Sequence, residues 1–148
     1  MRVETTTITK KVLRNINRLD PVTMYLEDLA PGQGKLTIDC FGKVWTAFWG
    51  GMGNENIAKF INSADIDYLA GKLFNGEKYV IDYDEISRKI GNEVERETLV
   101  YYEDKVVNIY GADWRMDLPT TINPKYEYLC RIITAVKEAI ANELMVAA

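Results

Sequence analysis

The segment Gly50-Gly51-Met52-Gly53 is one of the few places where residue types and spacing could do chemistry. It lies between a predicted strand and a predicted helix with Asn54 as N-cap, where backbone N–H groups can hold a phosphate. Its spacing matches neither the dinucleotide-binding fingerprint nor the P-loop, and no lysine follows the glycines. A tight turn that needs positive φ explains the glycines as well, so we favour a structural role.

Acidic residues gather in two short runs that could hold Mg²⁺ or supply a general acid and a general base. Runs of this kind are more often solvated faces of helices, and we interpret both in that way. The runs consist of Asp82, Asp84 and Glu85, and of Glu93, Glu95 and Glu97.

The sequence contains no histidine and two cysteines, Cys40 and Cys130. The missing histidine removes the Ser-His-Asp and Cys-His arrangements and the commonest metal ligand. Two separated cysteines cannot build a structural zinc site of the usual kinds. We therefore expect no catalytic, cofactor-binding or metal-binding residues and predict that the protein is not an enzyme. Both cysteines should be buried free thiols, and one disulfide is the alternative.

Length and composition indicate one soluble globular domain spanning residues 1–148. Hydrophobic residues make up 47% of the sequence and charged residues 27%, and no repeat or Gly/Ser/Pro linker divides it. No run approaches the roughly 20 apolar residues that a bilayer span requires, and the N-terminus lacks a secretion signal. We expect a cytoplasmic protein.

The first half of the sequence predicts strands. Residues 5–9 are β-branched and should form a strand, and residues 22–29, 35–41 and 44–49 alternate in polarity between tight turns that contain glycine. This pattern predicts an antiparallel β-meander of three to four strands packed against several helices, which is an α+β fold.

The second half predicts mostly helices. One begins after Asn54, a second near Asp65 and a third near Asp84, with a short strand over residues 79–81. Residues 99–110 fit a helix or a strand, and we favour the helix; residues 114–123 read as a loop. A long C-terminal helix should begin with Asn123 as N-cap and Pro124 at its first position. Its apolar stripe consists of Tyr126, Leu129, Cys130, Ile133, Val136, Ile140 and Leu144.

Aromatic residues provide the best candidates for contact with a partner. Trp45 and Trp49 face the same side of one predicted strand, where we expect the C-terminal helix to cover them. If they were exposed, they would instead be anchors for a partner. A second stretch combines aromatic and acidic residues, and it reads either as a half-buried helix or as a binding surface. It consists of Tyr101, Tyr102, Tyr110 and Trp114 beside Glu103, Asp104, Asp113 and Asp117. The candidate partner-binding residues are Trp45, Trp49, Tyr102, Glu103, Asp104, Tyr110 and Trp114.

The net charge of −4 is unevenly distributed. Residues 1–20 hold five basic and two acidic side chains, a net +3, so the remainder carries −7. An acidic body argues against a protein that grips phosphates along its whole face. The alternative function is a nucleic-acid-associated protein that uses a basic arm, made of Lys10, Lys11, Arg14 and Arg18.

Residues 13–22, 25–28 and 43–53 resemble small proteins encoded by bacteriophages and prophages of enteric bacteria. The resemblance implies a phage accessory protein that acts in the bacterial cytoplasm. Such proteins are often inhibitors of host defence, including anti-CRISPR proteins, and commonly act by occluding a surface rather than by chemistry. The resemblance assigns no role to any single residue.

We accordingly expect a non-enzymatic protein that binds a host protein or complex. We also expect a homodimer, because a meander has open edges and the C-terminal helix has more apolar surface than one domain can cover. The N-terminal strand or the C-terminal helix should form that interface.

Overall fold

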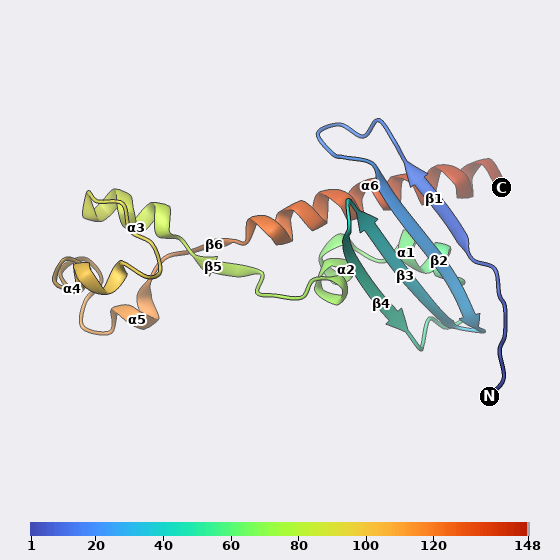
Figure 1. The fold of residues 1–148 in the computed structure, drawn as a ribbon, viewed down its shortest axis with the longest axis horizontal. Coiled ribbons are helices and arrows are strands. Elements are labelled where there is room, and N and C mark those ends of the chain that lie inside the picture. Colours follow the sequence, from blue (N-terminus) through green and yellow to red (C-terminus); the bar gives the residue numbers. More distant parts are fainter. Residues whose placement is uncertain (148) are drawn as a thin grey trace. The chain divides into compact units, whose positions relative to one another are not determined.

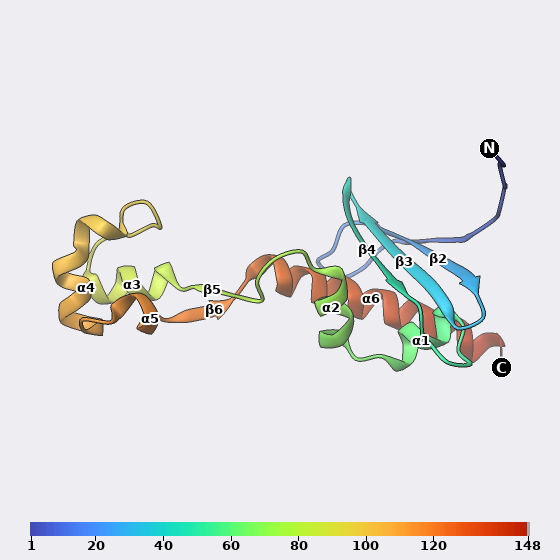
Figure 2. The ribbon, with the colours of Figure 1, turned by 90° about the horizontal axis from the view of Figure 1, so that it is seen from below.

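The computed structural model describes residues 1–147 and has an α+β architecture (Figures 1 and 2). The chain divides into two compact units. Unit 1 comprises Met1–Asn75 and the chain from Lys125 onward, and unit 2 comprises Gly76–Pro124. Each unit has a hydrophobic core of its own. The single domain expected over residues 1–148 stays a prediction, and the units are described separately below.

Unit 1 is built on a four-stranded antiparallel sheet with the order β1-β2-β3-β4. The predicted meander and the α+β class are therefore confirmed. The strands are β1 (Thr9–Leu13), β2 (Val22–Ala30), β3 (Gln33–Cys40) and β4 (Lys43–Trp49).

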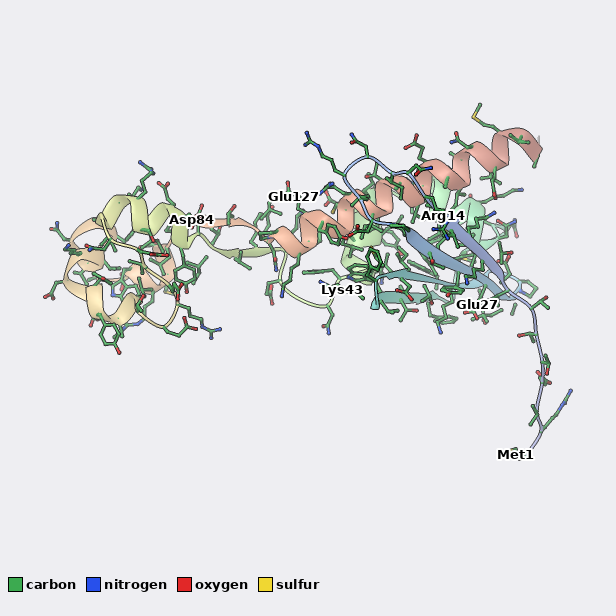
Figure 3. All side chains as sticks on the ribbon, turned by 45° about the horizontal axis from the view of Figure 1, so that its top comes forward. Met1, Arg14, Glu27, Lys43, Asp84 and Glu127 are labelled. Atoms are coloured by element: carbon green, nitrogen blue, oxygen red, sulfur yellow. The ribbon has the colours of Figure 1, made fainter. Side chains whose placement is uncertain are left out.

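The predicted strand over residues 5–9 is wrong, because the first strand begins at Thr9. Residues 1–8 are exposed, and Figure 3 shows Met1 at the free end of this segment, away from the sheet. β-Branched residues favour a strand when they have a partner strand and a surface to pack on, and residues 5–8 have neither.

Turn chemistry fixes the register of the sheet. Phe41 and Gly42 both have positive φ, 49° and 80°, as a two-residue type I′ hairpin requires between Cys40 and Lys43. Between β2 and β3, Gly32 has a φ of 74°, and a Cβ there would come within 2.8 Å of the Gly53 carbonyl oxygen. Glycine is therefore required at position 32, because of the positive φ and because a side chain would collide with the backbone of Gly53.

Apolar and polar residues alternate along β2 and β3, so the buried apolar side chains face three helices. These are α1 (Ile57–Ser63), α2 (Ile66–Leu73) and α6 (Pro124–Ala147). The second helix starts after Asp65, as predicted, but the first is capped by Asn56 rather than Asn54. The sequence could not reveal that Asp28, on β2, accepts a hydrogen bond from the first N–H of α1 at 2.8 Å.

The C-terminal helix α6 follows the predicted stripe in most positions. Cys130 and Leu144 are half-buried rather than buried, and Ile132, which the stripe omitted, is fully buried. The buried residues of α6 are Tyr126, Leu129, Ile132, Ile133, Val136 and Ile140.

Unit 2 is mainly helical. The pair β5 (Tyr79–Ile81) and β6 (Thr120–Ile122) joins its two ends, and between them lie α3 (Tyr83–Ile90), the 3-10 helix η1 (Leu99–Tyr102), α4 (Glu103–Tyr110) and α5 (Trp114–Asp117). The prediction of a helix over residues 99–110 is thus confirmed. The predicted loop over residues 114–123 is wrong, because α5 and β6 form there. Elements of three or four residues are too short to show a periodic pattern in the sequence.

No helix within residues 1–147 is long and apolar enough to cross a membrane.

Candidate functional site

The two tryptophans on β4 are buried, each with 6% of its surface exposed. Trp45 lies beside Tyr128 of α6, with ring centroids 6.5 Å apart, so the C-terminal helix covers Trp45 as predicted. Trp49 is instead covered by α1 and α2: it packs against Phe60, and its Nε1 donates a hydrogen bond to Tyr68 Oη at 3.1 Å. The exposed alternative is wrong for both rings, which serve the core of unit 1.

The remaining candidate partner-binding residues all lie in unit 2, but they do not form one surface. Trp114 is buried, and Tyr102 and Tyr110 are half-buried and pack against the core of unit 2. The Tyr110 hydroxyl is buried and has no hydrogen-bond partner among the described residues. Glu103 and Asp104 are exposed on α4. Of the five residues, the two acids are therefore the ones open to a partner.

Exposed apolar side chains beside these acids complete a surface. The sequence pattern indicated Tyr101 and the two acids, but not Val100 or Val107. Val100, Glu103, Asp104 and Val107 recur at helical spacing, so they share one side of η1 and α4. Tyr101 next to them is 80% exposed. We call these five residues the acidic-apolar face. The inward stripe Leu99, Tyr102 and Val106 could have revealed it, because the opposite side must then face solvent.

The negative charge of the protein lies mainly in unit 2. Residues 76–124 hold eleven acidic and six basic side chains, a net −5. The rest of the chain holds eleven acidic and twelve basic side chains, a net +1. Unit 2 is therefore the acidic part of the protein, with a negative potential around it.

Ion pairs reduce that charge at a few positions. On α3, Arg88 donates to both carboxylate oxygens of Glu85 at 2.7 and 2.8 Å, and this hydrogen bonding lowers the pKa of Glu85. Arg115 lies 3.5 Å from Glu103. These pairs are exposed and are worth little to stability.

The basic arm does not form one patch. Lys10 lies opposite Tyr25 on the sheet face away from the helices and sits over the Tyr25 ring, whereas Lys11 lies opposite buried Met24 and pairs with Glu143 of α6. Lys10 and Lys11 thus lie on opposite faces of the sheet, and Lys11 is neutralised by Glu143. The nucleic-acid alternative stays a prediction with less support.

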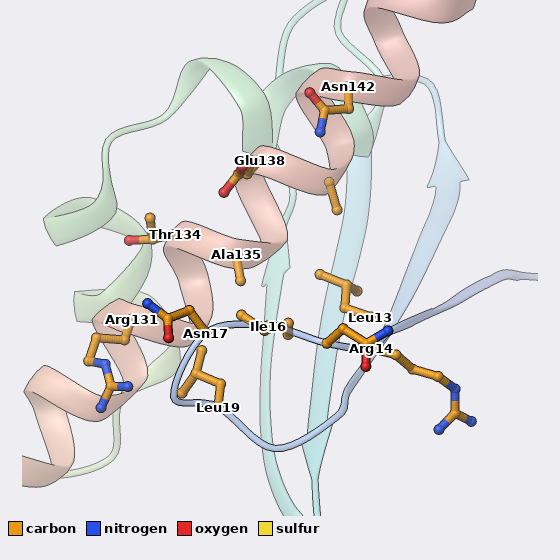
Figure 4. A pocket seen from close by; sticks show the side chains of 12 residues that line it. Leu13, Arg14, Ile16, Asn17, Leu19, Arg131, Thr134, Ala135, Glu138 and Asn142 are labelled. Atoms are coloured by element: carbon orange, nitrogen blue, oxygen red, sulfur yellow. The ribbon is translucent and has the colours of Figure 1, made fainter.

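The loop after β1 covers part of α6 instead. It lines an open hollow of about 580 Å³ against this helix (Figure 4). Ile16 and Leu19 lie on the side of α6, while the Arg14 side chain extends away from it in this view. Arg131 of α6 donates a hydrogen bond to the Arg18 carbonyl oxygen at 2.7 Å and holds the loop in place.

The glycine-rich turn also serves the fold. Gly53 has a φ of 66°, Met52 is buried, and the Met52 N–H donates to the Gly32 carbonyl oxygen at 2.8 Å. The carboxylate of Asp28 already occupies the N-terminus of α1. An incoming anion would therefore meet a negative charge where the N–H groups point.

The acids singled out in the sequence have structural partners or face solvent. Asp82 caps α3 by accepting from the Glu85 N–H at 2.9 Å, and Glu93, Glu95 and Glu97 are exposed. Within residues 1–147, no group of three or more Asp, Glu or Cys side chains is placed to hold a metal ion.

Neither cysteine forms a disulfide within the described residues, as expected. Cys40 is buried and lies 3.5 Å from Tyr128 Oη, and this hydrogen bond together with burial raises the pKa of Tyr128 to about 12. Cys130 is half-buried rather than buried.

Comparison with protein families defines the class: this is a phage protein, since a model described as a phage family matches residues 1–142. The chain belongs to that family, Phage_phiTE_072. The match extends over both units and confirms that the chain is phage-associated, as inferred from residues 13–22, 25–28 and 43–53. No curated protein and no solved structure matches the chain.

Proposed function

We propose that this phage protein acts by binding a protein or protein complex of the host cell, in the host cytoplasm, without chemistry of its own. The observation that carries the proposal is the acidic-apolar face of unit 2, where three exposed apolar side chains adjoin two exposed carboxylates. This combination fits a partner with an apolar depression bordered by basic residues.

Each part of the face has a physical role in such a complex. Tyr101 offers a large amphipathic ring with few rotatable bonds, which is the kind of side chain found at interface hot spots. Glu103 and Asp104, with the net charge of −5 on unit 2, favour approach to a basic surface and exclude acidic ones.

Aromatic residues packed in the core of unit 2 support the face from beneath. Tyr102 and Trp114 pack with Leu99 and Val106 in the core, so η1 and α4 present a preformed surface. A rigid surface loses less conformational entropy on binding than a flexible segment does.

Host defence complexes are the first targets to test, because the resemblance to proteins of enteric phages points to inhibitors of defence, anti-CRISPR proteins among them. An inhibitor of this type blocks a surface and needs no catalytic residues. Lysates of enteric bacteria that carry such systems are the appropriate source of partners.

The test is affinity capture with the full chain and two matched double variants. Tyr101→Ala with Asp104→Asn removes one tyrosine and one carboxylate from the acidic-apolar face. Tyr79→Ala with Asp84→Asn removes the same groups from exposed positions elsewhere in unit 2.

We expect the wild-type chain and the second variant to recover the same host protein, and the first variant to lose it. Recovery should fall as salt rises, because exposed charges are screened. Equal recovery by all three chains, or no specific protein at low salt, would overturn the proposal.

A further inference from the structure

The free edge of β4 is the strand edge in unit 1 best suited to pair with another chain. β4 is the last strand of the sheet and pairs on one side only, with β3 (Figure 1). After Lys43 it carries no charge over six residues. Natural proteins usually protect an exposed edge of this kind with charges, proline or a bulge.

The turn before β4 determines which backbone groups face the open side. A type I′ turn joins Cys40 and Lys43, so these two form a hydrogen-bonded pair with β3. Hydrogen-bonded and non-hydrogen-bonded pairs alternate in an antiparallel ladder. The N–H and C=O groups of Val44, Thr46 and Phe48 therefore point away from β3.

The same three residues are exposed, with Val44 at 54% and Phe48 at 57%. Their side chains lie on the sheet face opposite the helices, since Trp45 and Trp49 between them are buried. An added strand would thus gain both a row of backbone hydrogen bonds and apolar neighbours on the open face.

We propose that a second copy of this chain pairs with β4 in antiparallel orientation, with Thr46 on the two-fold axis. In this register Thr46 faces its own copy and Val44 faces Phe48 of the partner. All three pairs fall on residues whose backbone groups point outward. Two four-stranded sheets become one continuous sheet.

The sequence of β4 is self-complementary in that register. Pairs of a β-branched and an aromatic residue stabilise adjacent strands, and the Val44–Phe48 pair occurs twice by symmetry. On the helix side, Lys43 falls opposite the partner's Trp49 and Trp45 opposite the partner's Ala47. No like charges meet.

The strand at the opposite edge of the sheet, β1, is not self-complementary in this way. β1 carries Lys10 and Lys11, and a two-fold pairing centred on its middle residue sets Lys11 against itself. Like charges directly opposite one another destabilise a strand pair. This places the homodimer at β4 instead of the N-terminal strand or the C-terminal helix expected from sequence.

The experiment measures mass by light scattering over a range of concentrations, using charge variants at position 46. A single strand pair is a small interface, so we expect reversible dimerisation with a dissociation constant in the micromolar range. The wild-type mass should rise from 16.9 kDa toward twice that value.

Thr46→Lys and Thr46→Glu place like charges on the two-fold axis at an exposed position, and each should remain monomeric. Mixing the two variants should restore the dimer, because the introduced charges are then opposite. This rescue could not occur if either variant were misfolded.

Val12→Lys on β1 and Val146→Lys on α6 are the controls, since both positions are exposed, and neither should change the mass. The inference is overturned by a wild-type chain that stays monomeric, by variants at position 46 that still dimerise, or by loss of the dimer in either control. The host-capture test does not depend on these results.

Discussion

Lys137 joins α6 to the end of α1, and its replacement by methionine tests how unit 1 is held together. The Lys137 ammonium donates hydrogen bonds to the carbonyl oxygens of Ile61 at 3.1 Å and Asn62 at 2.9 Å, and also to that of Ala64. The last carbonyls of a helix have no partner within it, so one side chain of α6 satisfies the end of α1.

The magnitude follows from those contacts. Hydrogen bonds that involve a charged group contribute about 1.5–3 kcal/mol each, but water can replace part of them because Asn62 is exposed. Burial also lowers the pKa of Lys137, because removing the ammonium from water disfavours its charged form. Methionine keeps the apolar stem. We expect Lys137→Met to lower the free energy of unfolding by about 2 kcal/mol.

Urea denaturation followed by tryptophan fluorescence measures this loss. Two of the three tryptophans, Trp45 and Trp49, lie in unit 1, so the signal reports mainly on that unit. Lys59→Met, at an exposed position on α1, is the matched control and should change stability by less than about 0.5 kcal/mol. Equal losses in the two variants would refute the role of Lys137.

Three further predictions concern other positions. Gly34→Ala should destabilise the protein by about 1–3 kcal/mol in the same assay, because the new Cβ would lie 2.9 Å from the Ile57 Cβ; an unchanged midpoint would contradict this. Tyr110→Phe should leave the melting temperature unchanged or raise it, since it removes a buried hydroxyl that has no hydrogen-bond partner; a clear loss would show that the hydroxyl is satisfied. The pKa of Glu85 is lowered from 4.5 by Arg88, so the pair contributes stability above pH 4.5 that is lost as pH falls through the lowered pKa. NMR titration of the carboxyl group should show this pKa, and Arg88→Ala should return it toward 4.5.

Local signals in the sequence predicted the sheet and most helices well. Alternation along β2 and β3 is regular, and Gly42 indicates the hairpin to β4, although the turn is Phe41-Gly42 and not the predicted Gly42-Lys43. What the sequence could not show depends on residues far apart in the chain. Asp28 caps a helix 29 positions later, and Tyr128 contacts Cys40 across 88 positions.

The candidate site was predicted in part. Tyr101, Glu103 and Asp104 are exposed, as a binding surface requires. Tyr102, Tyr110 and Trp114 are buried or half-buried. Composition alone does not distinguish Tyr101 from Tyr102, which differ by about a third of a turn in direction. Which of the two tyrosines is exposed depends on how Leu99 and Val106 pack in the core of unit 2, because that packing sets the side of the helix that faces inward.

The ends of unit 2 meet at one place. Tyr79 pairs with Ile122, and the Asn123 N–H donates to the Lys78 carbonyl oxygen at 2.7 Å, so entry and exit lie side by side. A segment that begins and ends at the same point can be exchanged as a cassette. Residues 76–124 could therefore be replaced by another segment whose ends lie equally close, without displacing Asn75 or Lys125, where the rest of the chain resumes.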